Sequence, residues 1–168
     1  FLLAAARDGI GSDISDIATE FCFNIEVTSP LTENELTTLT WLLAETFEPR
    51  NFSSSSFLSQ DTFPGVLLEV GPRMNFTTAW STNAVAVCLA CGLRKVSRIE
   101  RSRRYRISFA KLPEDIRAWE RALLSLIHDR MTECPYPKPL ASFDSGTRPE
   151  PVKSVPLLEE GRDALLQI

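Results

Sequence analysis

The segment from Val96 to Phe109 places the strongest constraint on how this chain can fold. In its second half, Tyr105, Ile107 and Phe109 occupy every second position, and polar residues alternate with them. Alternation with a period of two is typical of a β-strand that has one buried face and one more polar face. The segment therefore predicts a half-buried strand, and such a strand needs partner strands to be stable.

The same kind of pattern predicts the other elements of the domain. The helix that begins at Thr32 carries Glu35 three residues later, which is the spacing of a capping box. For a later helix, either Ser81 or Thr82 is the expected cap. The predicted elements, in chain order, are strand 21–27, helix 32–48, strand 66–70, helix 81–91, strand 96–109 and helix 113–133.

Burial can be predicted for three of these elements. Residues 66–70 are nearly all apolar, which indicates a central strand that is buried on both faces. The helix 81–91 is apolar nearly all round, so other elements or a partner are expected to enclose it. The first helix is expected to bury a stripe of leucines, namely Leu36, Leu39, Leu42 and Leu43.

Two segments have the composition of connections. Residues 50–65 are polar and contain four consecutive serines, so a long surface loop is predicted. Six of the eleven prolines follow residue 134, which predicts an extended linker over residues 135–156 that leaves the domain. A new helix is predicted to begin within residues 157–168.

Charge is distributed unevenly along the chain. The net charge is −4, yet residues 94–106 contain seven basic residues and one acidic residue. This basic strip, with Tyr105 in it and Phe109 just after it, could contact RNA. Alternatively, it could be a solvated edge strand, or its arginines could pair with the acidic first half or with another domain. The acidic balance of the whole chain argues against nucleic acid. The apolar run at residues 1–6 is too short to cross a membrane, so no membrane partner is expected.

The turn between residues 71 and 83 is the part of the sequence that is richest in candidate binding residues. It joins a predicted buried strand to a predicted helix, and the N–H groups at a helix N-terminus attract anions. The alternative is a capped turn whose hydroxyls serve only their own helix. The candidate binding or domain-contact residues, including three from the basic strip, are Arg73, Asn75, Thr77, Thr78, Ser81, Thr82, Asn83, Arg101, Arg103 and Arg104.

Neither catalytic nor metal chemistry is expected from the remaining reactive residues. Cys88 and Cys91 lie late in an apolar helix, so two buried thiols are favoured over a redox pair. A zinc site would also need His128 and Cys134, which only tertiary structure could bring together. His128 is expected to be structural, and no nucleophile motif accompanies it. The chain by itself is therefore predicted to be catalytically inactive, with no metal site.

Seven segments in this order resemble one enzyme family, the large glutamine-dependent form of phosphoribosylformylglycinamidine synthase. The resemblance covers nearly the whole chain from about residue 19, whereas residues 1–18 match least well. The residues in these motifs are similar to those of the plant and algal enzymes. The matching segments are residues 19–25, 41–49, 68–73, 76–85, 98–105, 128–133 and 161–165.

The resemblance implies a fold and a role. It implies an α+β domain over residues 19–134, with an antiparallel or mixed sheet and helices packed on it, similar to a fused dimer of the small PurS-type subunit. Residues 157–168 would then begin a helical linker domain. The parent enzyme would use ATP, Mg²⁺ and glutamine to convert formylglycinamide ribonucleotide to formylglycinamidine ribonucleotide.

The resemblance also implies partners and a location. The domain would bridge the synthetase and glutaminase domains of the same parent chain, with no cofactor bound by this part. The similarity to plant and algal enzymes implies a plastid location. If the chain is not of plant or algal type, a cytoplasmic location is implied. A second hypothesis from a different class is a non-catalytic PurS-like scaffold that serves another assembly.

Overall fold

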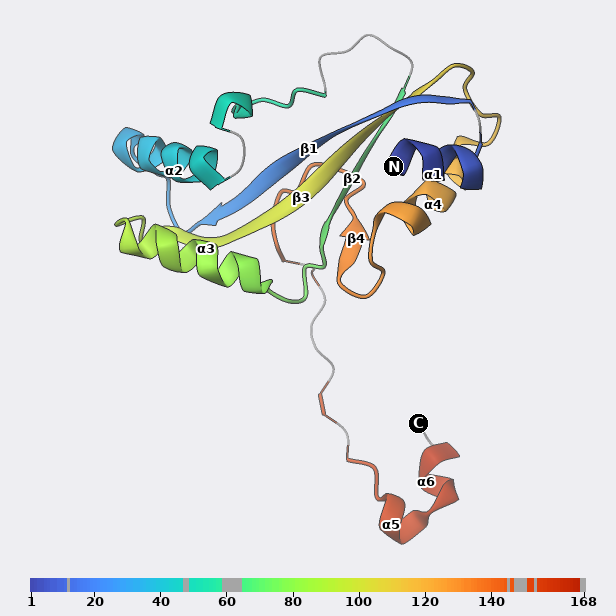
Figure 1. Cartoon of the computed structure of the whole chain (residues 1–168). Coiled ribbons are helices and arrows are strands. Elements are labelled where there is room, and N and C mark those ends of the chain that lie inside the picture. The colour runs from blue at the N-terminus through green and yellow to red at the C-terminus, as the bar shows by residue number, and fades with distance from the viewer. Residues whose placement is uncertain are drawn as a thin grey trace.

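The computed structural model describes residues 1–11, 13–46, 49–58, 65–144, 146, 151–152 and 154–166 (Figure 1). Within these residues, four antiparallel strands form one sheet in the order β1-β3-β2-β4. The strands are β1 (Ile14–Val27), β2 (Gly65–Pro72), β3 (Val96–Phe109) and β4 (Glu133–Pro135). The 14-residue β3 lies in the interior of the sheet, between β1 and β2.

Helices connect and flank the strands, so the α+β class is confirmed. The sheet is wholly antiparallel among its described strands. The helices are α1 (Leu2–Gly9), α2 (Glu33–Thr46), the 3₁₀ helix η1 (Pro49–Asn51), α3 (Ala79–Ala90), α4 (Ile116–Ile127), α5 (Leu157–Glu160) and α6 (Arg162–Leu166). Among the described residues, no helix has both the length and the apolar character that crossing a membrane requires.

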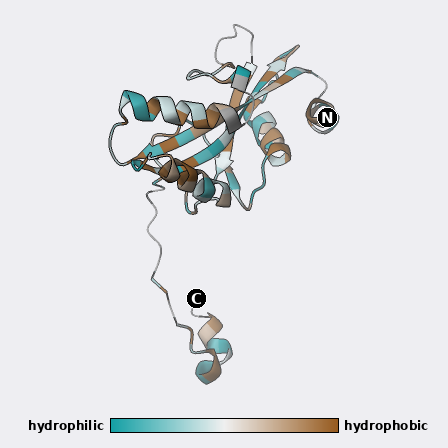
Figure 2. Cartoon of the chain, turned by 60° about the vertical axis from the view of Figure 1, so that its left-hand side comes forward, coloured by the Kyte–Doolittle hydropathy of each residue, from teal (hydrophilic) through white to brown (hydrophobic). Residues whose placement is uncertain are grey.

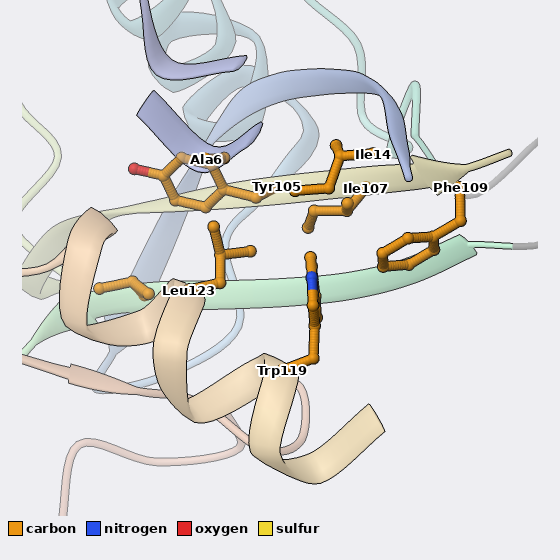
Figure 3. Close-up of a cluster of buried hydrophobic side chains, with 8 residues drawn as sticks. Ala6, Ile14, Tyr105, Ile107, Phe109, Trp119 and Leu123 are labelled. Carbon is orange, nitrogen blue, oxygen red and sulfur yellow. The ribbon is translucent and has the colours of Figure 1, made fainter. Parts of the chain in front are cut away.

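Two hydrophobic clusters lie on the same face of the sheet, because both draw on odd-numbered residues of β3. Ile99 packs with residues of α2 and α3 at one end of the strand, and Ile107 packs with residues of α1 and α4 at the other. Figure 3 shows the second cluster, in which the rings of Phe109 and Trp119 meet edge to face at 4.6 Å between centroids. Bands of apolar and polar residues alternate along the strands in Figure 2, as one buried face requires.

The opposite face of the sheet is polar and is covered by the segment after β4. Tyr136 and Phe143 from this segment are buried, and the Tyr136 hydroxyl donates to the Pro72 carbonyl at 2.6 Å. Gly71 allows this close approach, because a Cβ at that position would lie 2.6 Å from the Tyr136 ring. The first part of the predicted linker therefore packs on the sheet. Residues 145, 147–150 and 153 of the linker lie outside the described residues, as do residues 59–64 of the predicted loop.

Several predicted boundaries were wrong. The first strand begins at Ile14, well before residue 21, and neither α1 nor β4 was predicted. The helix predicted over residues 113–133 ends at Ile127, because His128 is extended and the Asp129 carboxylate accepts from the N–H of Met131 in a tight turn. The cap of α3 is neither Ser81 nor Thr82, as described below.

The burial predictions hold only in part. Helix α3 is not enclosed by the described part of this chain, since Val87 and Leu89 are 50% and 58% exposed, so its enclosure by a partner stays a prediction. In α2, Leu39 and Leu43 are buried as predicted, whereas Leu36 is 55% exposed. Strand β2 has the predicted interior position, but half-exposed Leu67 shows that only one of its faces is fully covered.

Candidate domain-contact surface

The arginines of β3 divide between the two faces of the sheet. Because successive side chains of a strand point to opposite faces, Arg98 and Arg104 lie on the polar face, while Arg101 and Arg103 lie on the face that carries the helices. A single basic strip in the sequence therefore becomes two groups with different surroundings.

Arg104 is held by carboxylates of the neighbouring strands. Its Nε donates to Glu69 on β2 at 2.9 Å, and its terminal nitrogen donates to Glu20 on β1 at 3.4 Å. Both carboxylate side chains are at least nine-tenths buried. Glu20 also accepts hydrogen bonds from the Ser56 hydroxyl and the Phe57 N–H. The hypothesis that the strip pairs with the acidic first half of the chain is thus confirmed for Arg104.

The same network continues across the middle of the sheet. The Ser102 hydroxyl donates to the second oxygen of Glu69 at 2.5 Å and accepts from the Asn24 amide at 2.9 Å. Cys22 lies beside it, and burial raises the pKa of this thiol. These contacts connect β1, β3 and β2 by side chains in addition to the backbone ladder.

Glu100 supplies the anion at the N-terminus of α3. This carboxylate is only 1% exposed, and it accepts from the Thr78 N–H at 3.1 Å and from the Thr78 hydroxyl at 2.7 Å. Thr78 is the N-cap, because its hydroxyl accepts from the Ser81 N–H at 3.0 Å. Arg98 completes the group by donating to Glu100 and to the carbonyls of Met74 and Phe76. Thr78 therefore fits the alternative of a capped turn, in which the hydroxyl serves its own helix.

The other candidate residues of the turn have separate surroundings. The Arg73 guanidinium donates to the Arg130 carbonyl at 2.8 Å, which ties the turn to the segment after α4. Ser81 is fully buried, and among the described residues its hydroxyl has no hydrogen-bond partner. Arg73 is exposed, as are Asn75, Thr77, Thr82 and Asn83.

Arg101 and Arg103 form a different group, which we call the arginine–aromatic patch together with Phe21 and Trp80. Both guanidinium carbons lie 4.5 Å from the ring centroid of Phe21, and that of Arg101 lies 5.8 Å from Trp80. Phe21 is 41% exposed. Burial, together with the charge of Arg103, lowers the pKa of Arg101 from its usual value. The patch thus presents two cations and an apolar ring on the accessible surface between the two hydrophobic clusters.

Thiols and the histidine give no reactive centre in the described residues. Cys88 is buried but Cys91 is exposed, so the prediction of two buried thiols was wrong for Cys91, which follows the last turn of α3. The Nδ1 atom of His128 contacts the Leu124 carbonyl of its own helix. Within the described part of the chain, no three His, Cys, Asp or Glu side chains are placed to hold a metal ion.

The carboxylates Glu20, Glu69 and Glu100 were not among the predicted site residues. Glu20 and Glu69 lie opposite Arg104 on the neighbouring strands, and Glu100 lies on β3 itself, all on the polar face of the sheet. The alternation of side chains along each strand was therefore the sequence signal that could have identified them. Glu100 is also the one acidic residue within the basic strip, which marks it as a candidate for internal pairing.

Most of this chain matches a known protein family. The family model described as formylglycinamide ribonucleotide amidotransferase N-terminal matches residues 20–141. The chain belongs to this family. The matched residues include all of α2, α3, β3 and β4, the packed Tyr136 and both groups of arginines.

Three relatives have sequences similar to that of this chain. The chain is 47% identical to "Probable phosphoribosylformylglycinamidine synthase, chloroplastic/mitochondrial" of Arabidopsis thaliana, over 99% of this chain and 12% of that protein. It is 50% identical to the phosphoribosylformylglycinamidine synthase of Dictyostelium discoideum, over 93% of this chain and 12% of that protein. The human protein of the same name is 40% identical over 91% of this chain and 11% of its own length. The chain thus spans about an eighth of the length of these relatives.

Proposed function

We propose that this chain is the N-terminal domain of a phosphoribosylformylglycinamidine synthase that acts in purine biosynthesis. The parent enzyme would convert formylglycinamide ribonucleotide, ATP and glutamine to formylglycinamidine ribonucleotide, ADP, phosphate and glutamate. The observation that carries this proposal is the 47–50% identity to relatives of that name across more than nine-tenths of the chain. The Arabidopsis relative is named chloroplastic/mitochondrial, and this supports a plastid location within the proposal.

The proposed role of this domain is to hold other domains of the parent chain together. Among its described residues, no three carboxylate, histidine or cysteine side chains come together to hold Mg²⁺, so other domains of the parent enzyme would bind ATP and Mg²⁺. What this domain does offer is the arginine–aromatic patch. Arginine is suited to bidentate pairing with carboxylates, and two cations over one exposed ring favour an acidic partner surface.

The test uses the full-length parent enzyme with Arg101 and Arg103 both replaced by alanine. We expect synthesis from glutamine to fall more than synthesis from added ammonia, because ammonia bypasses the contact between glutaminase and synthetase. A lost interfacial charge pair costs about 2 kcal/mol at the low end, which is roughly a 30-fold change in the ratio of the two activities.

Arg121→Ala is the matched control, since Arg121 is an exposed arginine on α4 away from the patch. It should leave both activities unchanged. An unchanged ratio in the Arg101→Ala/Arg103→Ala enzyme would refute the bridging role of the patch. A full-length protein that forms no formylglycinamidine ribonucleotide from the three substrates would refute the proposed reaction itself.

A further inference from the structure

A cavity of about 950 Å³ lies beside β1, next to the hydrophobic cluster of α2 and α3, with which it shares Leu39 and Leu43 as lining residues. Strand β1 provides one wall, α2 a second, and the segment from Asn51 to Phe57 a third. Five consecutive residues of β1, 19–23, line it. Since successive side chains of a strand point to opposite faces, a cavity that touches all five meets the strand along its edge.

This edge of β1 is the outer edge of the sheet. The strand order begins with β1, and no described strand pairs with its outer side. Native proteins protect such an edge with proline, charged residues, a very short strand, or a helix or loop that covers it. Here the segment from Asn51 to Phe57 approaches the edge and donates hydrogen bonds to the side chain of Glu20. Strand β1 has fourteen residues and contains neither proline nor lysine. Its length and composition therefore suit the addition of another strand.

The walls of the cavity define what it can accept. On the side of the helices the lining is apolar and includes Phe23, Leu36 and Leu39. On the opposite side it is polar and includes Glu20, Arg104 and the serines 53–56. An extended segment with alternating apolar and polar residues matches both walls, because its side chains also alternate between the two faces.

Charge argues against a second copy of this chain as the occupant. Strand β1 carries Asp16, Glu20 and Glu26 and no basic residue, so two copies paired edge to edge would oppose acidic side chains. A source of other segments exists in the proposed parent enzyme, since the relatives are about eight times longer than this chain. This step rests on the proposed function.

We propose that the outer edge of β1 and the cavity beside it receive an extended segment from another domain of the same polypeptide, which adds to the sheet as a fifth strand. Residues 19–25 span roughly 24 Å at the usual rise per residue, which is enough to pair with a segment of about six residues. The segment presents apolar side chains to α2 and polar or basic side chains to the serines. Its backbone hydrogen bonds supply affinity, and the cavity supplies selectivity.

Hydrogen exchange in the full-length enzyme tests the proposal. In the wild type, the amides of residues 19–25 should exchange slowly, including those that point away from β3. Thr40 lines the cavity from an exposed position on α2, so Thr40→Trp should fill it and speed the exchange of the outward amides by at least about tenfold. Thr37→Trp is the matched control, because Thr37 is also exposed on α2 but does not line the cavity.

The outcomes separate the alternatives. Amides of β3 must stay protected in every variant; if Thr40→Trp disturbs them, half-exposed Leu36 allows Leu36→Lys as a milder block of the same wall. Fast exchange of all outward amides in the wild type overturns the proposal, as does equal exchange in the two tryptophan variants. Protection that grows with protein concentration indicates a second copy and also overturns it. Fast exchange in an enzyme that still forms its product refutes only this docking, whereas protection without product formation refutes only the proposed reaction.

Discussion

Replacement of Arg104 by methionine should strongly destabilise the fold. The guanidinium of Arg104 is the shared partner of Glu20 and Glu69, whose side chains are 10% and 9% exposed. Methionine preserves much of the length and apolar stem of the side chain but removes both charge-assisted hydrogen bonds. Two mostly buried carboxylates then remain side by side without their cation.

The magnitude follows from this geometry. Removing one partner of a buried ion pair costs about 3–5 kcal/mol, because the other charge stays buried without compensation. Ser102 still donates to Glu69, and Ser56 still donates to Glu20, so we expect the low end of that range, about 3 kcal/mol. For a chain of this length, the loss corresponds to a decrease in Tm of roughly 6–12 °C.

Thermal and urea unfolding of wild type and variants at pH 7 measure this loss. Arg103→Met is the control, because Arg103 is an exposed arginine of the same strand whose contact with Phe21 is worth less than about 1 kcal/mol. A double-mutant cycle with Glu69→Gln should give a coupling energy of about 1–3 kcal/mol. An unfolding free energy of Arg104→Met within about 0.5 kcal/mol of the wild type, or an equal loss in Arg103→Met, would contradict this prediction.

Two further predictions concern pH and thiol reactivity. The hydrogen bond from Lys95 lowers the pKa of Glu35 from 4.5 to about 2, so its stabilisation is present above pH 4.5 and is lost as the pH falls toward 2. Glu35→Gln should flatten the decline of the unfolding free energy in that window, and equal slopes for variant and wild type would contradict this. Exposed Cys91 should react at once with a thiol reagent, whereas Cys88, whose pKa is raised mainly by burial, should react only after denaturation. Equal labelling of the two in mass spectra of native protein would be the opposite result.

Local patterns predicted the elements whose own residues determine them. The alternation at Tyr105, Ile107 and Phe109 correctly placed these side chains in the core. The capping box at Thr32 is present, with the Thr32 N–H donating to the Glu35 carboxylate at 2.7 Å and the Glu35 N–H donating back to the hydroxyl at 3.3 Å. In each case, the signal and its structural partner lie close together in the sequence.

Long-range contacts decided the features that were missed. Strand β1 begins at Ile14 because pairing with the end of β3 extends it beyond its apolar part. Thr78, and neither of the hydroxyl residues after it, caps α3, since Glu100 from another element accepts both of its hydrogen bonds. Tyr136 packs on the sheet although prolines surround it in sequence, because Gly71 on β2 leaves room for its ring. No window of the sequence contains both partners of any of these contacts.

The basic strip shows how a single feature of the sequence can serve two purposes. Within β3, Arg103, Arg104 and Arg106 lie between β1 and β2, whereas Arg98 and Arg101 pair with β1 alone. Strand parity then decides which face of the sheet each arginine meets. On the polar face, Arg98 and Arg104 contact carboxylates of this same domain, and these ion pairs stabilise the sheet and the turn before α3. On the odd face, Arg101 and Arg103 meet the half-exposed ring of Phe21, where an acidic surface of another domain can still reach them. Replacements of these four arginines should therefore alternate in effect, with loss of stability at Arg98 and Arg104 and a changed ratio of glutamine-dependent to ammonia-dependent synthesis at Arg101 and Arg103.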